Sequence, residues 1–364
     1  MKTSTTSTAL PPWTWISPIA GWLLLGLSMW SNHLMVEICV GAGLVACVLA
    51  AVHHAEVVAH RVGEPFGSLV LALAVTVIEV ALIVSLMLSA GDATVTLARD
   101  TIFAAIMIIL NGMVGLCVLV GATRHREQAF GHYGVNAVLA TLATMSMITL
   151  VLPNTTTTIA GPLYSTSQLV LMAVASLTLY GAFVLVQTVR HRDYFLPDGA
   201  AATDENAHAP PPSNRVALIS TLLLLFCLGA VVLLAKALAP TIENAVLAAG
   251  APKAIVGIII ATIVLMPESL AALKAARNNR LQTSLNLALG SALASIGLTI
   301  PAVAMVAFVT GWPLVLGLDV KGMALLILTL IVATLSLGTG RTTVLQGVVH
   351  LVIFVVYLFT TIVP

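Results

Sequence analysis

Charged residues are scarce in this chain of 364 residues: Asp, Glu, Lys and Arg together make up 8% of it, against about 25% in an average soluble domain. Hydrophobic residues make up 59% and the mean hydropathy is +1.08. Such a chain lacks the polar surface of a soluble domain, and its continuous apolar runs lack the alternation of a membrane β-barrel. The composition therefore predicts an all-α polytopic membrane protein embedded in the lipid bilayer.

Cysteine and net charge are equally limited. The four cysteines lie within apolar runs and form no Cys-x-x-Cys pair, so we expect them to be packing residues. The formal net charge of +1 provides no basic field for binding nucleic acid. The N-terminal stretch MKTSTTSTAL contains a single lysine and no clear cleavage site, which favours a retained first span over a removed signal peptide.

Catalytic motifs are also missing. An intramembrane metalloprotease requires HExxH, and the nearest stretch, HLMVE, lacks it. The chain contains no GxSxG serine motif, and the Gly-Asp of SAGDA has no partner aspartate on a second deep span. We therefore expect neither an enzyme nor a bound cofactor.

The apolar runs between polar breaks predict eleven membrane helices. The predicted helices cover 13–31, 33–54, 65–90, 97–121, 135–153, 166–189, 215–238, 252–274, 281–308, 320–338 and 342–363. On this map the 15 Lys and Arg residues divide into 11 on the side of the N-terminus and four on the other side. The positive-inside rule then places the N-terminus in the cytoplasm and the C-terminus on the external, periplasmic side.

One long polar interruption, residues 191–214, is rich in Ala, Pro and acidic residues, which predicts a cytoplasmic linker. A regulatory cation site there is the alternative, with Asp198, Asp204, Glu205 and His208 as its ligands. The linker divides the chain into a tail and first helix (1–31), a first five-helix repeat (32–190) and a second repeat (215–364). Because five is odd, the second repeat crosses the membrane in the opposite sense, as in the inverted repeats of secondary transporters.

Two glutamates lie deep in this apolar chain. Glu79 is about 14 residues from the start of its predicted helix and Glu268 is about 16 from the start of its own, so both lie about 21–24 Å along their helices. The helices enter from opposite faces, and each is the second of its repeat. Intramembrane carboxyl groups usually mark ion or proton pathways, and the mirrored depths favour this interpretation over a protonated Glu that bonds two helices.

Several neighbouring groups could complete a cation site. Pro267 removes a backbone N–H beside Glu268 and frees carbonyl oxygens one turn earlier. Ser291, Ser295 and Asn111 offer further oxygens on the helices that follow the two glutamate helices, and Thr76 offers a hydroxyl three residues before Glu79. For Ser291 and Asn111 the alternative is hydrogen bonding between helices.

Three other polar residues have a choice of roles. Asp92 and Asp100 lie near the external ends of their helices, as residues of the pathway mouth or as helix-start caps. His350 in the last predicted helix is either a packed histidine or a proton relay.

Three stretches resemble a known family. Residues 267–301 (PESLAALKAARNNRLQTSLNLALGSALASIGLTIP) look like the second signature repeat of the calcium/cation exchanger superfamily, in its proton-antiporting branch. Residues 63–103 resemble the first repeat, and residues 338–351 (GTGRTTVLQGVVHL) resemble the final helix. The resemblance implies inverted five-helix halves, alternating access, and a site at Glu79 and Glu268.

The resemblance also assigns particular positions. The Gly-Ser of the second repeat corresponds to Gly290 and Ser291. Where calcium/proton exchangers have Gly-Asn before each glutamate, this chain has Val75-Thr76 and Val264-Leu265, and Ala294 replaces a common Gln. Fewer amides leave a less complete shell for calcium, so sodium or potassium is expected as readily as Ca²⁺.

The sequence thus predicts a secondary active antiporter of the cell (inner) membrane. Its partners are small inorganic cations and protons, and it exports Ca²⁺ and/or Na⁺/K⁺ in exchange for H⁺ because protons and metal ions compete for the same carboxylates. A passive cation channel is the alternative, and it would carry a current that is not coupled to pH.

Overall fold

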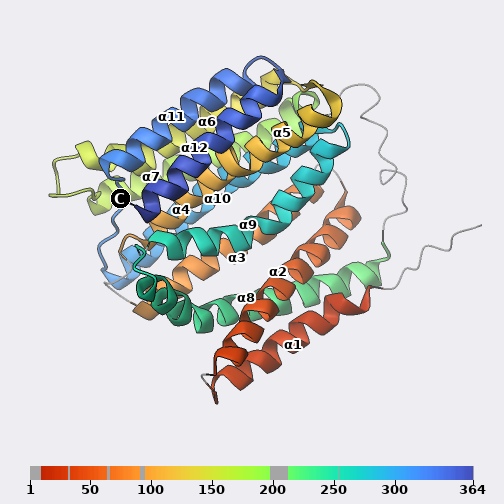
Figure 1. Cartoon of the computed structure of the whole chain (residues 1–364), viewed down its shortest axis with the longest axis vertical. Coiled ribbons are helices and arrows are strands. Elements are labelled where there is room, and N and C mark those ends of the chain that lie inside the picture. The colour runs from red at the N-terminus through yellow and green to blue at the C-terminus, as the bar shows by residue number, and fades with distance from the viewer. Residues whose placement is uncertain are drawn as a thin grey trace, which may run out of the picture. The chain divides into compact units, whose positions relative to one another are not determined.

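The computed structural model describes residues 10–31, 33–63, 66–90, 95–196, 212–252 and 254–363. Over these residues the chain folds into eleven long helical segments (Figure 1), which confirms the predicted all-α fold. In chain order the segments are α1 (Pro12–Ser28), α2 (Leu34–Val62), α3 (Phe66–Ala90), α4–η2–α5 (Leu97–Met107, Ile108–Met113, Val114–His125), α6–η3–η4 (His132–Ser146, Met147–Val151, Leu152–Thr155), α7–η5 (Thr166–Leu185, Val186–Arg190), α8 (Asn214–Ala248), α9 (Ala254–Arg277), α10 (Leu281–Thr310), α11 (Val320–Leu337) and α12 (Val344–Ile362).

Each predicted apolar run corresponds to one of these segments. Within the described ranges, nine segments are long and apolar enough to cross a membrane. The other two are α1, which has 17 residues, and α3, which contains the shorter apolar stretch Leu73–Ser85. The protein is therefore a polytopic helical membrane protein.

Two helices are longer than the sequence predicts. The predicted end of one helix at residue 238 is wrong, because α8 continues through Pro240 to Ala248. Proline is tolerated in membrane helices where side chains and neighbouring helices support the backbone, and the adjacent Thr241 donates a hydrogen bond to Glu37 on α2 (3.0 Å). Likewise α2 extends past residue 54 to Val62, and His54 is fully buried with its Nε2 3.1 Å from the carbonyl of Thr14.

The chain divides into two compact units. The first comprises Met1–Ile78 with Glu205–Thr241, and the second comprises Glu79–Asp204 with Ile242–Pro364. In the first unit α1 packs closely on its neighbours because Gly21 has no side chain: a Cβ there would lie 2.5 Å from Cys47 Sγ and 3.2 Å from Leu234. The indole of Trp22 stacks on Phe226 in the same unit, with ring centroids 5.5 Å apart.

In the second unit, equivalent helices of the two halves of the chain make equivalent contacts. Helix α12 packs along α5 and η2. The segment equivalent to α12, five segments earlier in the chain, is α7. Helix α7 packs along α10, and α10 is the equivalent of α4–η2–α5, five segments later. Helices α6 and α11, which are also five segments apart, pack on each other. This is the arrangement that an inverted repeat predicts.

Two short strand pairings repeat the same pattern in the loops. The strand β1 (Gln128–Ala129), between α5 and α6, pairs antiparallel with β2 (Arg341–Thr342), between α11 and α12. A single antiparallel bridge joins Leu163, between η4 and α7, to Val315, between α10 and α11. Each pairing joins one half of the chain to the other, and moving five segments along the chain converts one pairing into the other.

The predicted linker at 191–214 begins with ordered structure. Residues Arg192–Phe195 form a short 3₁₀ helix, η6, in which the Phe195 ring is buried and its carbonyl accepts a 2.6 Å hydrogen bond from Asn286 Nδ2. The first residues of the polar stretch therefore pack within the second unit. The candidate cation ligands of the linker lie outside the described residues: Asp198, Asp204, Glu205 and His208.

Candidate functional site

Glu79 on α3 and Glu268 on α9 lie at matching depths. Glu79 is 13 residues after the first residue of its helix (79 − 66) and Glu268 is 14 after the first of its own (268 − 254), which is about 20 Å along each axis. Each residue is only 5% exposed. The structure thus buries two acids that are 189 positions apart in the sequence at equivalent places on their helices.

The carboxyl oxygens of the pair are poorly satisfied. Oε2 of Glu79 accepts a short hydrogen bond from Ser295 Oγ on α10. Among the described residues, the other oxygen of Glu79 and both oxygens of Glu268 are buried without a hydrogen-bond partner. Two ionised carboxylates in such a place would be strongly unfavourable, so the pair needs protons or a bound cation. Either a proton or a cation would neutralise such a carboxylate.

Two hydroxyl groups from the predicted site lie near these positions on the same helices. Thr76 on α3 is 3% exposed and precedes Glu79 by three residues, so the two share a helix face. Ser291 is half-buried on α10, and it precedes Ser295 by four residues and shares its face. The described residues include no cluster of three or more His, Cys, Asp or Glu side chains that could hold a metal, so a cation here would need oxygens such as these hydroxyls.

Pro267 lies within α9 without ending it. Its missing N–H leaves the carbonyl of Ile263, four residues earlier, without its usual helical donor. The next carbonyl of interest, that of Leu265, accepts a 2.7 Å hydrogen bond from Ser269 Oγ. A backbone oxygen is therefore free of its helical bond about one turn from Glu268, on an otherwise continuous helix.

Asn111 has partners other than the glutamates. It lies in the π-helical turn η2 and is fully buried. Its Nδ2 donates to Thr329 Oγ1 on α11 (2.9 Å), and its Oδ1 is 3.2 Å from His350 Nδ1 on α12. The imidazole is in turn 2.7 Å from Ser336 Oγ through Nε2. The structure therefore places Asn111 in a second buried polar cluster, and none of its hydrogen bonds reaches Glu79 or Glu268.

Two members of this cluster, Thr329 and Ser336, are not among the residues predicted from the sequence. Both lie within the apolar stretch LLILTLIVATLSL of α11, where a single hydroxyl is ordinary. Their signal is that they lie seven residues apart, on one face of the helix. The partner of Thr329 is 218 residues away along the chain and that of Ser336 is 14 residues away, which no local pattern indicates.

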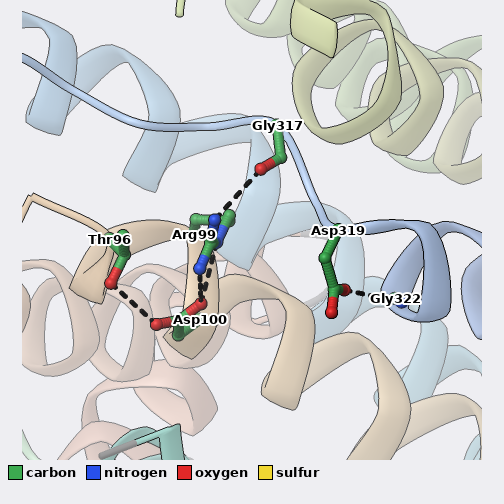
Figure 2. Close-up of polar contacts among 6 residues, drawn as sticks. All are labelled: Thr96, Arg99, Asp100, Gly317, Asp319 and Gly322. Atoms are coloured by element: carbon green, nitrogen blue, oxygen red, sulfur yellow. Dashed lines mark hydrogen bonds and ion pairs between the residues drawn. The ribbon is translucent and has the colours of Figure 1, made fainter. Parts of the chain in front are cut away.

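Asp100 lies in the first turn of α4, and Figure 2 shows how its carboxylate is held. Thr96 Oγ1 donates to Oδ2 (2.9 Å), and Arg99 contacts Oδ1 through Nε (2.8 Å) and Nη2 (2.7 Å). Arg99 also donates to the carbonyl of Gly317, in the segment that leads to α11 (3.1 Å). Asp100 thus has the contacts of an ion-paired residue at a helix start, while Asp92 lies outside the described residues.

These observations define a class: an all-α membrane protein with inverted halves and a pair of buried carboxyl groups carried on equivalent helices. The family comparison agrees, because the family model described as sodium/calcium exchanger protein matches residues 32–189 and 219–363. The chain belongs to this family.

Known proteins resemble the chain over nearly its whole length. It is 48% identical over 364 residues to y4hA of Sinorhizobium fredii, covering 98% of each chain. It is 37% identical over 344 residues to the sodium-potassium/proton antiporter ChaA of Escherichia coli, covering 93% of each. The crystal structure of the Ca²⁺/H⁺ antiporter protein YfkE has the same fold, with a TM-score of 0.70 over 96% of this chain and 99% of that one at 17% identity.

Proposed function

We propose that this protein is a secondary active cation/proton antiporter that exports Ca²⁺ and/or Na⁺/K⁺ in exchange for protons. The main observation in support is the buried pair Glu79 and Glu268, in which three carboxyl oxygens have no hydrogen-bond partner among the described residues. Family membership supports the same function, since the named relatives include a sodium-potassium/proton antiporter and a Ca²⁺/H⁺ antiporter.

The exchange follows from the chemistry of the pair. A proton neutralises a buried carboxylate through a covalent O–H bond, and a cation neutralises it through coordination, so each displaces the other. On the side where protons are abundant the glutamates take protons and release the cation. On the other side they lose the protons and bind the cation again. Antiport requires that the loaded pair faces one side at a time.

The proposed cation ligands are the two carboxylates together with nearby hydroxyls and backbone carbonyls. Glu79, Glu268, Ser295, Ser291 and Thr76 supply the side-chain oxygens. A calcium ion takes six to eight oxygens, part of them from water, whereas a monovalent cation is satisfied by fewer charges. The physiological cation is therefore a matter for direct measurement. Asn111 is proposed as a ligand in a second state of the site, and Asp100 as a residue of the external mouth.

We propose the membrane arrangement from the distribution of basic residues. The N-terminus lies in the cytoplasm and the C-terminus on the external side of the inner membrane. The transport domain consists of the repeats 32–190 and 215–364, joined by the cytoplasmic linker 191–214 after the tail and first helix 1–31. Alternating access then moves helices of one repeat relative to the other around the glutamate pair.

The test is cation-driven proton movement in everted membrane vesicles that contain the protein, followed with a pH-sensitive dye. Added Ca²⁺, Na⁺ or K⁺ should release protons from acidified vesicles, and Glu79→Gln and Glu268→Gln should each abolish this response, because a neutral amide cannot exchange a proton for a cation. Glu127→Gln is the matched control, since Glu127 is exposed and pairs with Arg341 on the surface (3.4 Å). Near-normal exchange in either glutamate variant would refute the site.

The same assay separates an antiporter from a passive channel. A channel would dissipate a cation gradient without moving protons, and it would carry net current in the absence of a pH gradient. Proton movement that requires a transported cation, and cation movement that requires a proton gradient, are expected here. Cation flux that is indifferent to pH would favour the channel.

A further inference from the structure

The cluster around His350 holds the Asn111 amide in one orientation. Because Asn111 Nδ2 donates to Thr329, its Oδ1 faces His350 as an acceptor, and Nδ1 of the imidazole must carry the proton. In the neutral imidazole Nε2 is then an acceptor, which matches its contact with Ser336 Oγ at 2.7 Å. Every polar side-chain group of His350 and Asn111 is thereby satisfied, so the amide is fixed.

Two glycines on the facing helical segment allow this contact. A Cβ on Gly115 would lie 2.9 Å from His350 Cβ and 3.2 Å from the Leu351 nitrogen. A Cβ on Gly112 would lie 3.3 Å from the Phe354 ring. The two glycines therefore let α12 approach the turn η2 closely enough for His350 to reach Asn111.

The inverted repeat gives Asn111 and Ser295 equivalent places. Asn111 is 14 residues after the first residue of α4 (111 − 97), and Ser295 is 14 after the first residue of α10 (295 − 281). Ser295 bonds Glu79 on α3, so the equivalent partner of Asn111 is Glu268 on α9. The turn η2 does pack against α9, yet both carboxyl oxygens of Glu268 lack a hydrogen-bond partner within the described part of the chain.

The helices α12 and α7, which occupy equivalent places in the two halves, carry different residues at the position equivalent to His350. His350 is six residues after the first residue of α12 (350 − 344), and the equivalent position on α7 is Met172 (166 + 6). A methionine cannot donate a hydrogen bond, so nothing at that place competes for Ser295. The histidine is thus present in the half where the equivalent of Ser295, Asn111, does not bond its glutamate, Glu268.

We propose that His350 and Thr329 are positioning residues that hold the Asn111 amide away from Glu268, and that its release supplies an additional amide ligand to the cation bound there. The π-helical turn provides a route, because moving its extra residue past Asn111 turns that side chain by about 100°, one residue's share of an α-helical turn. The inference rests on the proposed antiport function, since it concerns the affinity of that same site.

The test is the cation concentration dependence of exchange in vesicles containing the full-length protein, measured with Ca²⁺, Na⁺ and K⁺ separately. Thr329→Val and His350→Ala each remove one restraint on the amide. Each should lower the KM for the transported cation by about threefold to tenfold, the range for one neutral hydrogen bond, whereas His350→Gln, which keeps a donor, should stay near the wild-type value. Thr334→Val is the matched control, because Thr334 lies on the same helix and bonds only its own backbone at Leu330 (2.8 Å).

The double variant Asn111→Ala/Thr329→Val decides whether the effect passes through Asn111. Its KM should equal that of Asn111→Ala alone. A merely structural role for the cluster would lower the amount of folded protein or the maximal rate and leave KM unchanged. Unchanged KM in both Thr329→Val and His350→Ala, with an active wild type, would overturn the inference. Absence of exchange in the wild type with all three cations would instead refute the proposed function.

Discussion

The hydrogen bond from Ser295 to Glu79 provides the sharpest quantitative test of the glutamate site. Ser295 is 1% exposed and its hydroxyl is the donor to Glu79 Oε2. The variant Ser295→Ala removes that donor and leaves all four oxygens of the pair without a side-chain partner. A hydrogen bond to an ionised group contributes about 1.5–3 kcal/mol, which corresponds to about tenfold to 150-fold in an equilibrium constant.

The direction of the effect follows from which state the hydroxyl stabilises. The donor favours the ionised carboxylate, the form that binds a cation, and its oxygen can itself coordinate the cation. Ser295→Ala should therefore raise the KM for the transported cation by at least about tenfold while the protein remains folded, because alanine is tolerated in a helix interior.

The measurement is exchange in everted vesicles over a range of cation concentrations at fixed pH, with the amount of folded protein determined by size-exclusion chromatography. Thr262→Val is the control, since it removes an exposed hydroxyl that bonds only the Ile258 carbonyl of its own helix (2.7 Å). A KM within about twofold of wild type, in protein that is folded and active, would show that this bond does not act on the transport site.

Two further predictions concern stability. Gly297→Ala should lower the free energy of unfolding by about 1–3 kcal/mol, because its Cβ would lie 2.7 Å from Tyr180 Cβ. Gly290→Ala on the same helix should be neutral or stabilising, because no neighbouring atom of the described residues would lie within 4 Å of its Cβ; equal effects of the two variants on thermal unfolding would contradict the packing. Asp319→Ala should cost about 0.5–2 kcal/mol, since its Oδ1 accepts from the Gly322 nitrogen at the start of α11 (2.8 Å), while Asp319→Asn should retain most of the stability.

The positions of the helices and of the paired acids could be predicted because both leave local signals in the sequence. An apolar run that is long enough indicates a membrane helix. A Glu within such a run is easily recognised, whichever face of the helix it lies on. The predicted ranges 97–121 and 281–308 correspond to α4–η2–α5 and α10. The continuation of α8 past Pro240 could not be predicted in the same way, because the helix is supported there by contacts that another helix provides.

The side-chain partners in the core were not predictable for a similar reason. For Asn111 the sequence predicts either a cation ligand or a residue that hydrogen-bonds between helices, and its bonds in the structure go to Thr329 and His350, which are 218 and 239 residues away. The π-helical turn that orients it has no distinctive composition, since IILNGM reads like any apolar helix with one amide. Which of several hydroxyls bonds a glutamate depends on helix rotation, which the sequence of one helix does not determine.

The strand pairings in the loops have a consequence for biosynthesis. β1 at Gln128–Ala129 finds its partner only in β2 at Arg341–Thr342, more than 200 residues later. Until residues 341–342 have been synthesised, β1 has no β2 to pair with, and the second unit is completed only after that point. The halves are thus mutually dependent for assembly, so either half made as a separate polypeptide would have to capture the other within the membrane.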